Sequence, residues 1–311
     1  MRQWRQEAWL TQVNGQWSKD AEGRDKKLAG IKNQLASQEG AASGDPPLAT
    51  RWYVNTQGQT MVVIPGPVEF MMGSPKTEKD RSDNEDQHKR RIGRSFAIAS
   101  KSVTLAEYLS LTKDRYEIGE KYTHSPDLPV VGMNWYMATA YCNLLSQKEG
   151  IPEDQWCYEK EAGGQVAKLK ENYLSLSGYR LPTEAEMEYA TRAGAMTSRY
   201  FGETDALLTH YGWYTKNSGD LLQRVGWKKP NDFGFFDAHG NCFTWCQEPY
   251  DAYPTDADEE FMEDKEIPKN QLVINSTVGR VLRGGSFDDQ MSFVRCSLRD
   301  ANVPTNRFLN Y

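Results

Sequence analysis

The hydrophobic positions divide the chain into a polar N-terminal stretch, a middle part with regular periodicities, and a long C-terminal part without them. Within the first stretch, apolar residues recur along one stripe of a predicted helix: Trp9, Leu10, Val13 and Trp17. We expect this helix to dock on the main domain or on a partner. Residues 39–50 are rich in Gly, Ser and Pro, which predicts a linker. We therefore expect a helical extension and linker over 1–50 and one domain over 51–311.

The start of the domain has strand character. Two apolar runs, 61–64 and 68–72, flank the turn residues Pro65-Gly66-Pro67, which predicts a hairpin. The charged run 75–94 that follows is typical of a solvated loop. Strand character returns at 95–98, and a helix is expected to begin at Thr104.

Two further helices have clear signals. Over 129–150, Trp135, Ala138, Cys142 and Leu145 recur at helical spacing, and Gly150 lies just past the expected end. Over 178–194, Thr183 and Glu186 form a capping-box pattern, which predicts a helix start. Its buried stripe is expected at Met187, Ala190 and Gly194. After that the periodicity fades, and an acidic insert at 256–266 predicts another solvated loop.

Composition narrows the classes of function. Of the 311 residues, 38% are hydrophobic and 12% aromatic, with 9 Trp and 16 Tyr, which favours a core packed by aromatic side chains. The net charge of −6 lacks the basic footprint of a nucleic-acid binder. There is no apolar run of about 20 residues to span a membrane and no signal-peptide pattern. Five cysteines in so long a chain do not suggest a disulfide scaffold, so we expect a cytoplasmic protein.

Five ordered segments resemble one family. They are MVVIPGPVEFMMGS, PVVGMNWYMATAYCNLLS, GYRLPTEAEMEYATRAG, NDFGFFDAHGNCFTWCQE, and RVLRGGSFDD followed by VRCSLRD. Their order and spacing are similar to those of the formylglycine-generating enzymes, or sulfatase-modifying factors, from about residue 52 to 311. The resemblance implies an α+β, C-type-lectin-like fold with two core helices, a small mixed sheet and much ordered loop. The family's domain continues into a Gly-Phe-Arg strand, so we expect the printed chain to be truncated or a fragment.

The chain departs from the family where the family's chemistry lies. In the oxidases, a pair of cysteines just after the Arg-Gly-Gly-Ser motif binds copper, which suits soft thiolate ligands. Here residues 287–294 hold no cysteine, and Cys296 comes later. A related branch uses a histidine-rich iron site, but the four histidines of this chain are isolated in sequence. We therefore expect neither copper nor iron.

The resemblance also implies a structural calcium ion in the central loop. The ligands would be the Asp237 side chain, the carbonyl groups of Gly240 and Cys242, and the side chain of Thr244. Oxygen ligands of this kind suit a hard cation. The family usually has Glu where this chain has Thr244, which weakens the expected site. Cys242 and Cys246 have no second pair of ligands in the sequence, so we interpret them as buried structural thiols rather than a zinc site.

The segment after Arg283-Gly284-Gly285-Ser286 carries the candidate binding residues. One branch of the family consists of variable proteins diversified by retroelements at Asn codons. Such a codon can give Asn, Asp, Phe, Leu or Ala, among others, but not Gln, Met, Lys, Trp or Glu. All the candidates fall in that set, whereas Gln290 and Met291 do not. The candidates are Asp288, Asp289, Phe293, Leu298, Asp300, Ala301, Asn302, Phe308, Leu309 and Asn310.

These observations favour a non-catalytic protein that binds a ligand on its C-terminal face, diversified by a retroelement. Aromatic residues supply contact area there, and short polar groups supply adaptable hydrogen bonds. The ligand would be a protein or a small molecule, with neither nucleic acid nor membrane as partner. Two alternatives stay open. One is a metal-dependent oxidase with a non-standard site, and the other is a regulatory module fused to a signalling protein.

Overall fold

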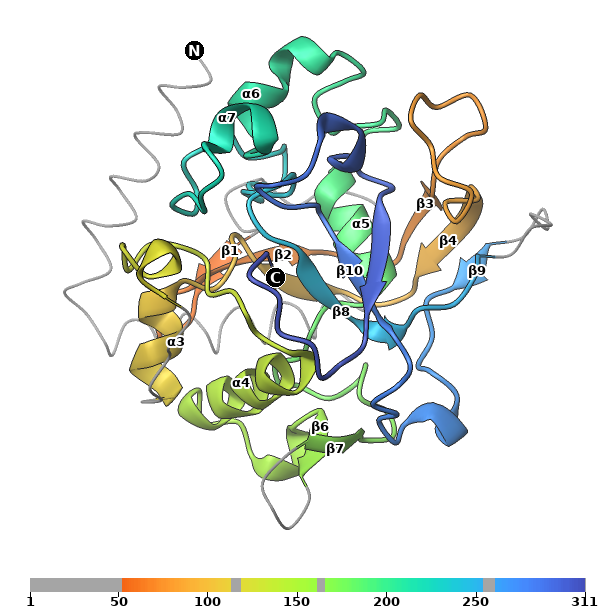
Figure 1. The fold of residues 1–311 in the computed structure, drawn as a ribbon. Helices are drawn as coiled ribbons and strands as arrows, with labels where there is room; N and C mark the ends of the chain where they lie inside the picture. Colours follow the sequence, from red (N-terminus) through yellow and green to blue (C-terminus); the bar gives the residue numbers. More distant parts are fainter. Residues whose placement is uncertain (1–51, 113–118, 161–165, 254–260, 311) are drawn as a thin grey trace. The chain divides into compact units, whose positions relative to one another are not determined.

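A computed structural model describes residues 52–112, 119–160, 166–253 and 261–310. The predicted N-terminal helix and the linker over 39–50 lie outside these ranges. The described strands are β1 (Trp52–Val54), β2 (Thr60–Ile64), β3 (Val68–Met72), β4 (His88–Ile92), β5 (Phe96–Ala99), β6 (Tyr158–Lys160), β7 (Val166–Leu169), β8 (Thr244–Pro249), β9 (Met262–Glu263), β10 (Arg280–Arg283) and β11 (Arg299–Asn302). The described α-helices are α3 (Leu105–Thr112), α4 (Trp135–Lys148), α5 (Glu184–Arg192), α6 (Leu208–Tyr211) and α7 (Thr215–Ser218). Short 3-10 turns cover Glu120–Tyr122, Glu153–Gln155, Asp205–Leu207, Lys269–Gln271 and Met291–Phe293. The predicted α+β class with little regular secondary structure is confirmed (Figure 1).

The strands form several small sheets rather than one large one. β10 lies between β8 and β11 and is antiparallel to both. β3 pairs antiparallel with β4, which pairs in parallel with β9, while β2 pairs with β5 and β6 with β7. The predicted hairpin of β2 and β3 is therefore wrong. Gly66 lies so close to the backbone of Arg94 that a Cβ atom would be 2.1 Å from the Arg94 carbonyl oxygen, and here the chain passes from one sheet to another.

The two predicted core helices are confirmed. The side chain of Asn134 accepts a hydrogen bond from Met137 N and caps α4, whose Trp135 and Leu145 are buried as expected. At the start of α5, both hydrogen bonds of the predicted capping box form between Thr183 and Glu186. Met187 and Ala190 are buried, whereas Gly194 is exposed just past the end of the helix, so that part of the predicted stripe is wrong.

Aromatic residues form much of the largest core cluster. Trp135 contacts Tyr158 edge to face, with 5.9 Å between ring centres, and its indole N–H donates to the Cys246 carbonyl at 3.0 Å. Trp245 of β8 similarly donates to the Met133 carbonyl at 2.8 Å. These bonds satisfy the polar atoms of large buried rings and attach α4 and its approach to the β8 strand.

Charged residues also fill the interior, on the face of α5 that packs against β3, β4, β8 and β10 (Figure 1). Glu188 pairs with Arg283 of β10 and with Arg192, whose Nε lies 2.8 Å from a Glu188 carboxylate oxygen. One turn earlier, Glu184 binds the Arg299 guanidinium of β11 through two hydrogen bonds of 2.8 and 2.9 Å. A buried carboxylate requires such partners because it has lost its hydration.

Two segments predicted as solvated loops contribute to this interior. The charged run 75–94 contains β4 and supplies the fully buried Glu85, which binds the Arg295 guanidinium at 2.6 Å. From the acidic insert, Asp264 is buried and binds Arg90 at 3.1 Å and Arg94 at 2.5 Å. Both loop predictions are wrong at these residues, because a charged side chain can be buried where an opposite charge meets it.

A half-buried carboxyl of β8 forms no salt bridge with any residue that the structure describes. Glu248 of β8 accepts a hydrogen bond from the Glu184 N–H at 2.8 Å. Burial, together with the nearby Asp264 and Glu184 carboxylates, raises its pKa to about 8. This carboxyl therefore keeps its proton at neutral pH in the folded protein.

The contribution of Glu248 to the free energy of unfolding should consequently fall as the pH rises. The stabilisation linked to the Glu248 proton is fully present below pH 4.5, the ordinary pKa of the group, and is lost progressively toward pH 8. Glu248→Gln, which stays neutral at every pH, should flatten this decline in urea titrations between pH 5 and 8. Glu159→Gln, at a half-exposed position of β6, serves as the control. A wild-type slope that is unchanged in Glu248→Gln would contradict the assignment.

Candidate ligand-binding site

The β10 and β11 strands present two faces of opposite character. Successive side chains of a strand point to opposite faces, and Leu282 lies opposite Asp300 in the β10–β11 register. Leu282, Asp300 and Asn302 therefore share the outer face. Arg283 and Arg299, also opposite each other, share the inner face and bind the carboxylates of α5.

The last described residues of the chain lie along this outer face. The Phe243 N–H donates to the Asn310 carbonyl at 2.8 Å, and the Trp135 N–H donates to the Pro304 carbonyl at 3.1 Å. The Arg307 guanidinium donates to the Gly132 carbonyl at 2.8 Å. These bonds fix the segment after β11 beside the sheet.

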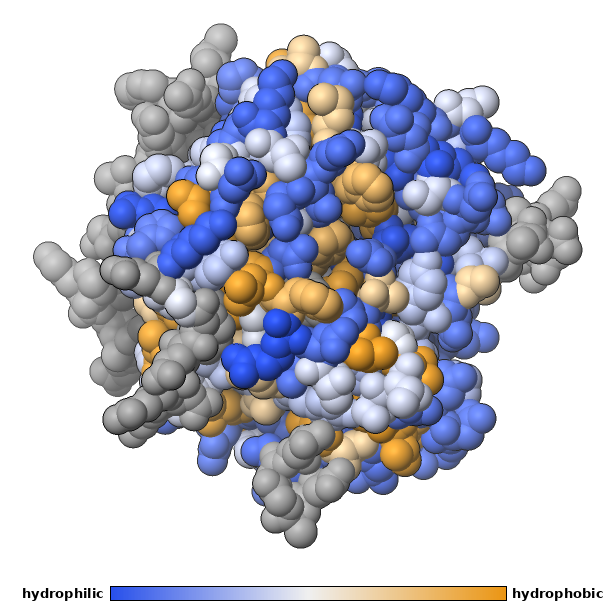
Figure 2. All heavy atoms as spheres, viewed as in Figure 1, coloured by the Kyte–Doolittle hydropathy of each residue, from blue (hydrophilic) through white to orange (hydrophobic). Residues whose placement is uncertain are grey.

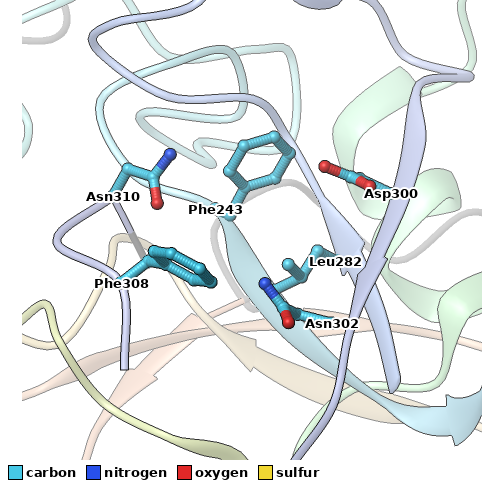
Figure 3. A pocket seen from close by; sticks show the side chains of 6 residues that line it. All are labelled: Phe243, Leu282, Asp300, Asn302, Phe308 and Asn310. Carbon is cyan, nitrogen blue, oxygen red and sulfur yellow. The ribbon is translucent and has the colours of Figure 1, made fainter. Parts of the chain in front are cut away.

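Between that segment and the sheet lies a pocket of about 230 Å³. It is lined by Phe243, Leu282, Asp300, Asn302, Phe308 and Asn310. Figure 3 shows the Phe243 and Leu282 side chains in the middle of this group, with Asp300 and Asn302 on one side and Phe308 and Asn310 on the other. Figure 2 shows apolar residues gathered at the centre of the same face, surrounded by polar ones. Phe243, Leu282 and Phe308 thus give the pocket apolar surface, and Asp300, Asn302 and Asn310 give it polar groups.

The structure brings four of the predicted binding residues together in this pocket: Asp300, Asn302, Phe308 and Asn310. Leu298 is buried in the core cluster that includes Leu282 and Phe243, and the strand alternation places Ala301 on the inner face. Leu309 is half-buried and is not part of the lining. Sequence reasoning missed Phe243 and Leu282. Phe243 lies in the segment assigned to the central loop, and Leu282 directly precedes the Arg-Gly-Gly-Ser motif.

The other predicted binding residues lie in the loop after β10. The Ser286 hydroxyl contacts a carboxylate oxygen of Asp288 at 2.6 Å and one of Asp289 at 2.7 Å, and the Ser286 N–H donates to Asp289 at 2.8 Å. Burial raises the pKa of Asp289, and the charges of Asp288 and Asp300 add to the effect. Phe293 is 48% exposed. Asp288, Asp289 and Phe293 are not among the pocket-lining residues.

The cysteines are poorly suited to thiolate chemistry. All five are buried and unpaired. Cys296 follows the Arg-Gly-Gly-Ser motif most closely, and burial raises its pKa to about 12. Its sulfur lies 3.9 Å from Nε2 of His239, whose pKa burial lowers to about 3. Both groups are therefore neutral at physiological pH.

The central loop shows one feature that suits a cation. Asp237 is buried, and one of its carboxylate oxygens accepts the Gly226 N–H at 2.6 Å while the other has no hydrogen-bond partner. Burial raises its pKa to about 6. Within the part of the chain that the structure describes, no group of three or more His, Cys, Asp or Glu side chains could hold a metal. The other ligands expected from the family resemblance, at Gly240, Cys242 and Thr244, are uncharged oxygens. Calcium here stays a prediction.

The small sheets, the two packed helices and the long ordered loops define a C-type-lectin-like domain of the formylglycine-generating-enzyme type. Residues 49–310 match the model of the sulfatase-modifying factor enzyme 1-like domain, and the chain belongs to this family. The formylglycine-generating enzyme of Streptomyces coelicolor is 28% identical over 306 residues, covering 87% of this chain and 92% of that enzyme. The predicted family is confirmed.

Other relatives differ in how much of their length is shared. Serine/threonine-protein kinase pkn1 of Chlamydia pneumoniae is 28% identical over 178 residues, or 57% of this chain but only 22% of the kinase. Treponema denticola variable protein 1 superposes with a TM-score of 0.67 and 25% identity, covering 86% of this chain and 97% of that protein. PvdO from Pseudomonas aeruginosa, with a TM-score of 0.61 and 23% identity over 85% and 95% of the two chains, shows the fold alone. The predicted fold is confirmed.

Calcium should stabilise the protein if Asp237 is a ligand. A saturating ion that binds only the folded state raises the free energy of unfolding by about 2.7 kcal/mol at 100 times its dissociation constant. We therefore expect thermal denaturation at a higher temperature in calcium than in EDTA. Asp237→Asn should lose this difference, and the exposed Asp232→Asn should retain it. Equal melting temperatures of the wild type in calcium and EDTA would contradict the prediction.

Proposed function

We propose that this chain is a recognition protein that binds its ligand in the pocket on the outer face of β10 and β11. The observation that carries the proposal is the division of these strands into two faces. Arg283 and Arg299 on the inner face form buried ion pairs, whereas Asp300 and Asn302 on the outer face line a pocket that also has apolar surface. Apolar surface combined with a few convergent polar groups is the usual composition of a ligand site.

The residues at the position of the family's copper site support the same conclusion. Residues 287–294 contain no cysteine, and carboxylates of Asp288 and Asp289 surround the Ser286 hydroxyl there instead. Carboxylate oxygens are hard ligands and do not replace a pair of thiolates at a copper site. Cys296 is buried and protonated.

The proposal includes diversification of the pocket residues by a retroelement. Four of its lining residues, Asp300, Asn302, Phe308 and Asn310, are all residues that a randomised Asn codon can encode. The similarity to the Treponema denticola variable protein supports this reading. A near-identical repeat in the neighbouring DNA, differing at adenines, is the observation that tests it.

Two observations favour other functions. The similarity to the Streptomyces coelicolor formylglycine-generating enzyme extends over 92% of that enzyme and supports an oxidase with a different site. The match to a part of a kinase supports a module that serves a signalling protein. In the second case the same pocket would be the module's recognition site.

A fragment screen tests whether the pocket binds ligands. Equal numbers of cationic, anionic and neutral fragments are screened by ligand-observed NMR against the wild type. Asn310→Trp should abolish binding because the larger ring fills the pocket. Thr305→Trp, at an exposed position of the same segment that does not line the pocket, should not.

The recognition proposal fails if the bound fragments are retained by Asn310→Trp, or if no fragment binds the wild type. It also fails if the purified protein carries stoichiometric copper or iron and oxidises a cysteine-containing peptide with oxygen. That second outcome would establish the oxidase alternative.

A further inference from the structure

The pocket holds a carboxylate without a cationic partner. Asp300 is exposed, and one of its carboxylate oxygens accepts the Ala301 N–H at 2.7 Å. Among the residues that the structure describes, no Lys, Arg or His forms a salt bridge with Asp300, whereas Glu85, Glu184, Glu186 and Glu188 are all paired with arginines. Asp300 is therefore the acidic side chain among the described residues that line the pocket, and it is available to a ligand.

Two further carboxyl groups, Asp288 and Asp289, lie near Asp300. The pKa of Asp289 is raised by burial and also by the Asp288 and Asp300 charges, which shows that the three carboxylates lie within reach of one another's fields. The nearby cation Arg280 lies opposite Asn302 in the β10–β11 register, on the same face. Arg280 is buried, donates to the Gln247 carbonyl at 3.0 Å and stacks on the Trp135 ring, and it does not line the pocket.

Two phenyl rings of the pocket provide aromatic surface for a ligand. Phe243 and Phe308 both line the pocket, and Phe308 is 53% exposed (Figure 3). The face of such a ring attracts a cation, and its area covers an alkyl stem. The amide groups of Asn302 and Asn310 beside the rings add short polar contacts.

The volume limits the size of the ligand. About 230 Å³ is less than the roughly 300–1,000 Å³ of pockets that enclose drug-sized molecules. It suits a group about as large as one amino-acid side chain.

Resting on the recognition function proposed above, we propose that the pocket selects a monovalent organic cation on a short apolar stem: an alkylammonium or guanidinium group. The cation pairs with Asp300, and the stem lies against Phe243 and Phe308. This chemistry occurs in small amines and in a lysine or arginine side chain of a polypeptide.

The test compares probes that differ only in charge. N-acetyl-lysine methylamide, the corresponding arginine derivative and the uncharged norleucine derivative are titrated by saturation-transfer NMR. We expect the two cations to bind about fivefold or more tightly than norleucine at low salt, as the sum of an exposed ion pair and a cation–π contact. The advantage should shrink as salt is added.

Variants test whether Asp300 causes the preference for cationic probes over norleucine. Asp300→Asn keeps the shape of an exposed side chain and should reduce the cation-to-norleucine ratio to about one. Asp232→Asn, also exposed and outside the pocket, should leave the ratio unchanged. Butylamine and a Gly-Gly-Lys-Gly-Gly peptide separate the two sources: a free amine if both bind alike, a polypeptide side chain if only the peptide binds.

Two results would overturn the inference. One is norleucine binding as tightly as lysine to the wild type, and the other is a cation preference that persists in Asp300→Asn. Either result leaves the recognition function standing if fragments still bind the wild type and are lost in Asn310→Trp. Absence of all binding in that screen removes both proposals together.

Discussion

The buried pair of Arg283 and Glu188 is the interaction on which the rest of the domain depends. It joins β10 to α5 where neither charge has access to water, and Glu188 also holds Arg192. Loss of one partner of such a pair leaves an uncompensated buried charge and typically costs about 3–5 kcal/mol, a large part of the stability of a domain. Beside it, the Glu184–Arg299 pair attaches β11 to the same helix. Ion pairs on the inner face therefore attach both strands of the candidate site to α5.

This arrangement separates the demands of folding from those of recognition. Arg283 and Arg299 point inward and cannot vary without loss of their partners, whereas Asp300 and Asn302 point outward on the same strands. The bonds to the Asn310 and Pro304 carbonyls fix the neighbouring segment through the backbone, independently of its side chains. A domain built in this way can present different pocket surfaces on one scaffold.

The sequence predicts the parts of the fold that follow local rules. The helices over 135–148 and 184–192 have capping residues and apolar spacing, and both form as expected. The partners of Gly66, Glu85 and Asp264 are distant in sequence, so local pattern could not reveal the sheet change at 66 or the burial of the two carboxylates. The pocket shows the same division. Asp300, Asn302, Phe308 and Asn310 were predicted from the residue types after the Arg-Gly-Gly-Ser motif. The contributions of Phe243 and Leu282 depend on the β8–β10 pairing, which no local signal reveals.

Native-state hydrogen exchange tests the central claim, that the scaffold is fixed independently of the pocket. It is measured on the wild type and on a variant in which Asp300, Asn302, Phe308 and Asn310 are all alanine. We predict that the sheet-bonded amides of β8 and β10 exchange only through global unfolding in both proteins. Exchange of the β10 amides through low-energy local opening in the variant would contradict the account, because the pocket side chains would then be part of what holds the strand in place.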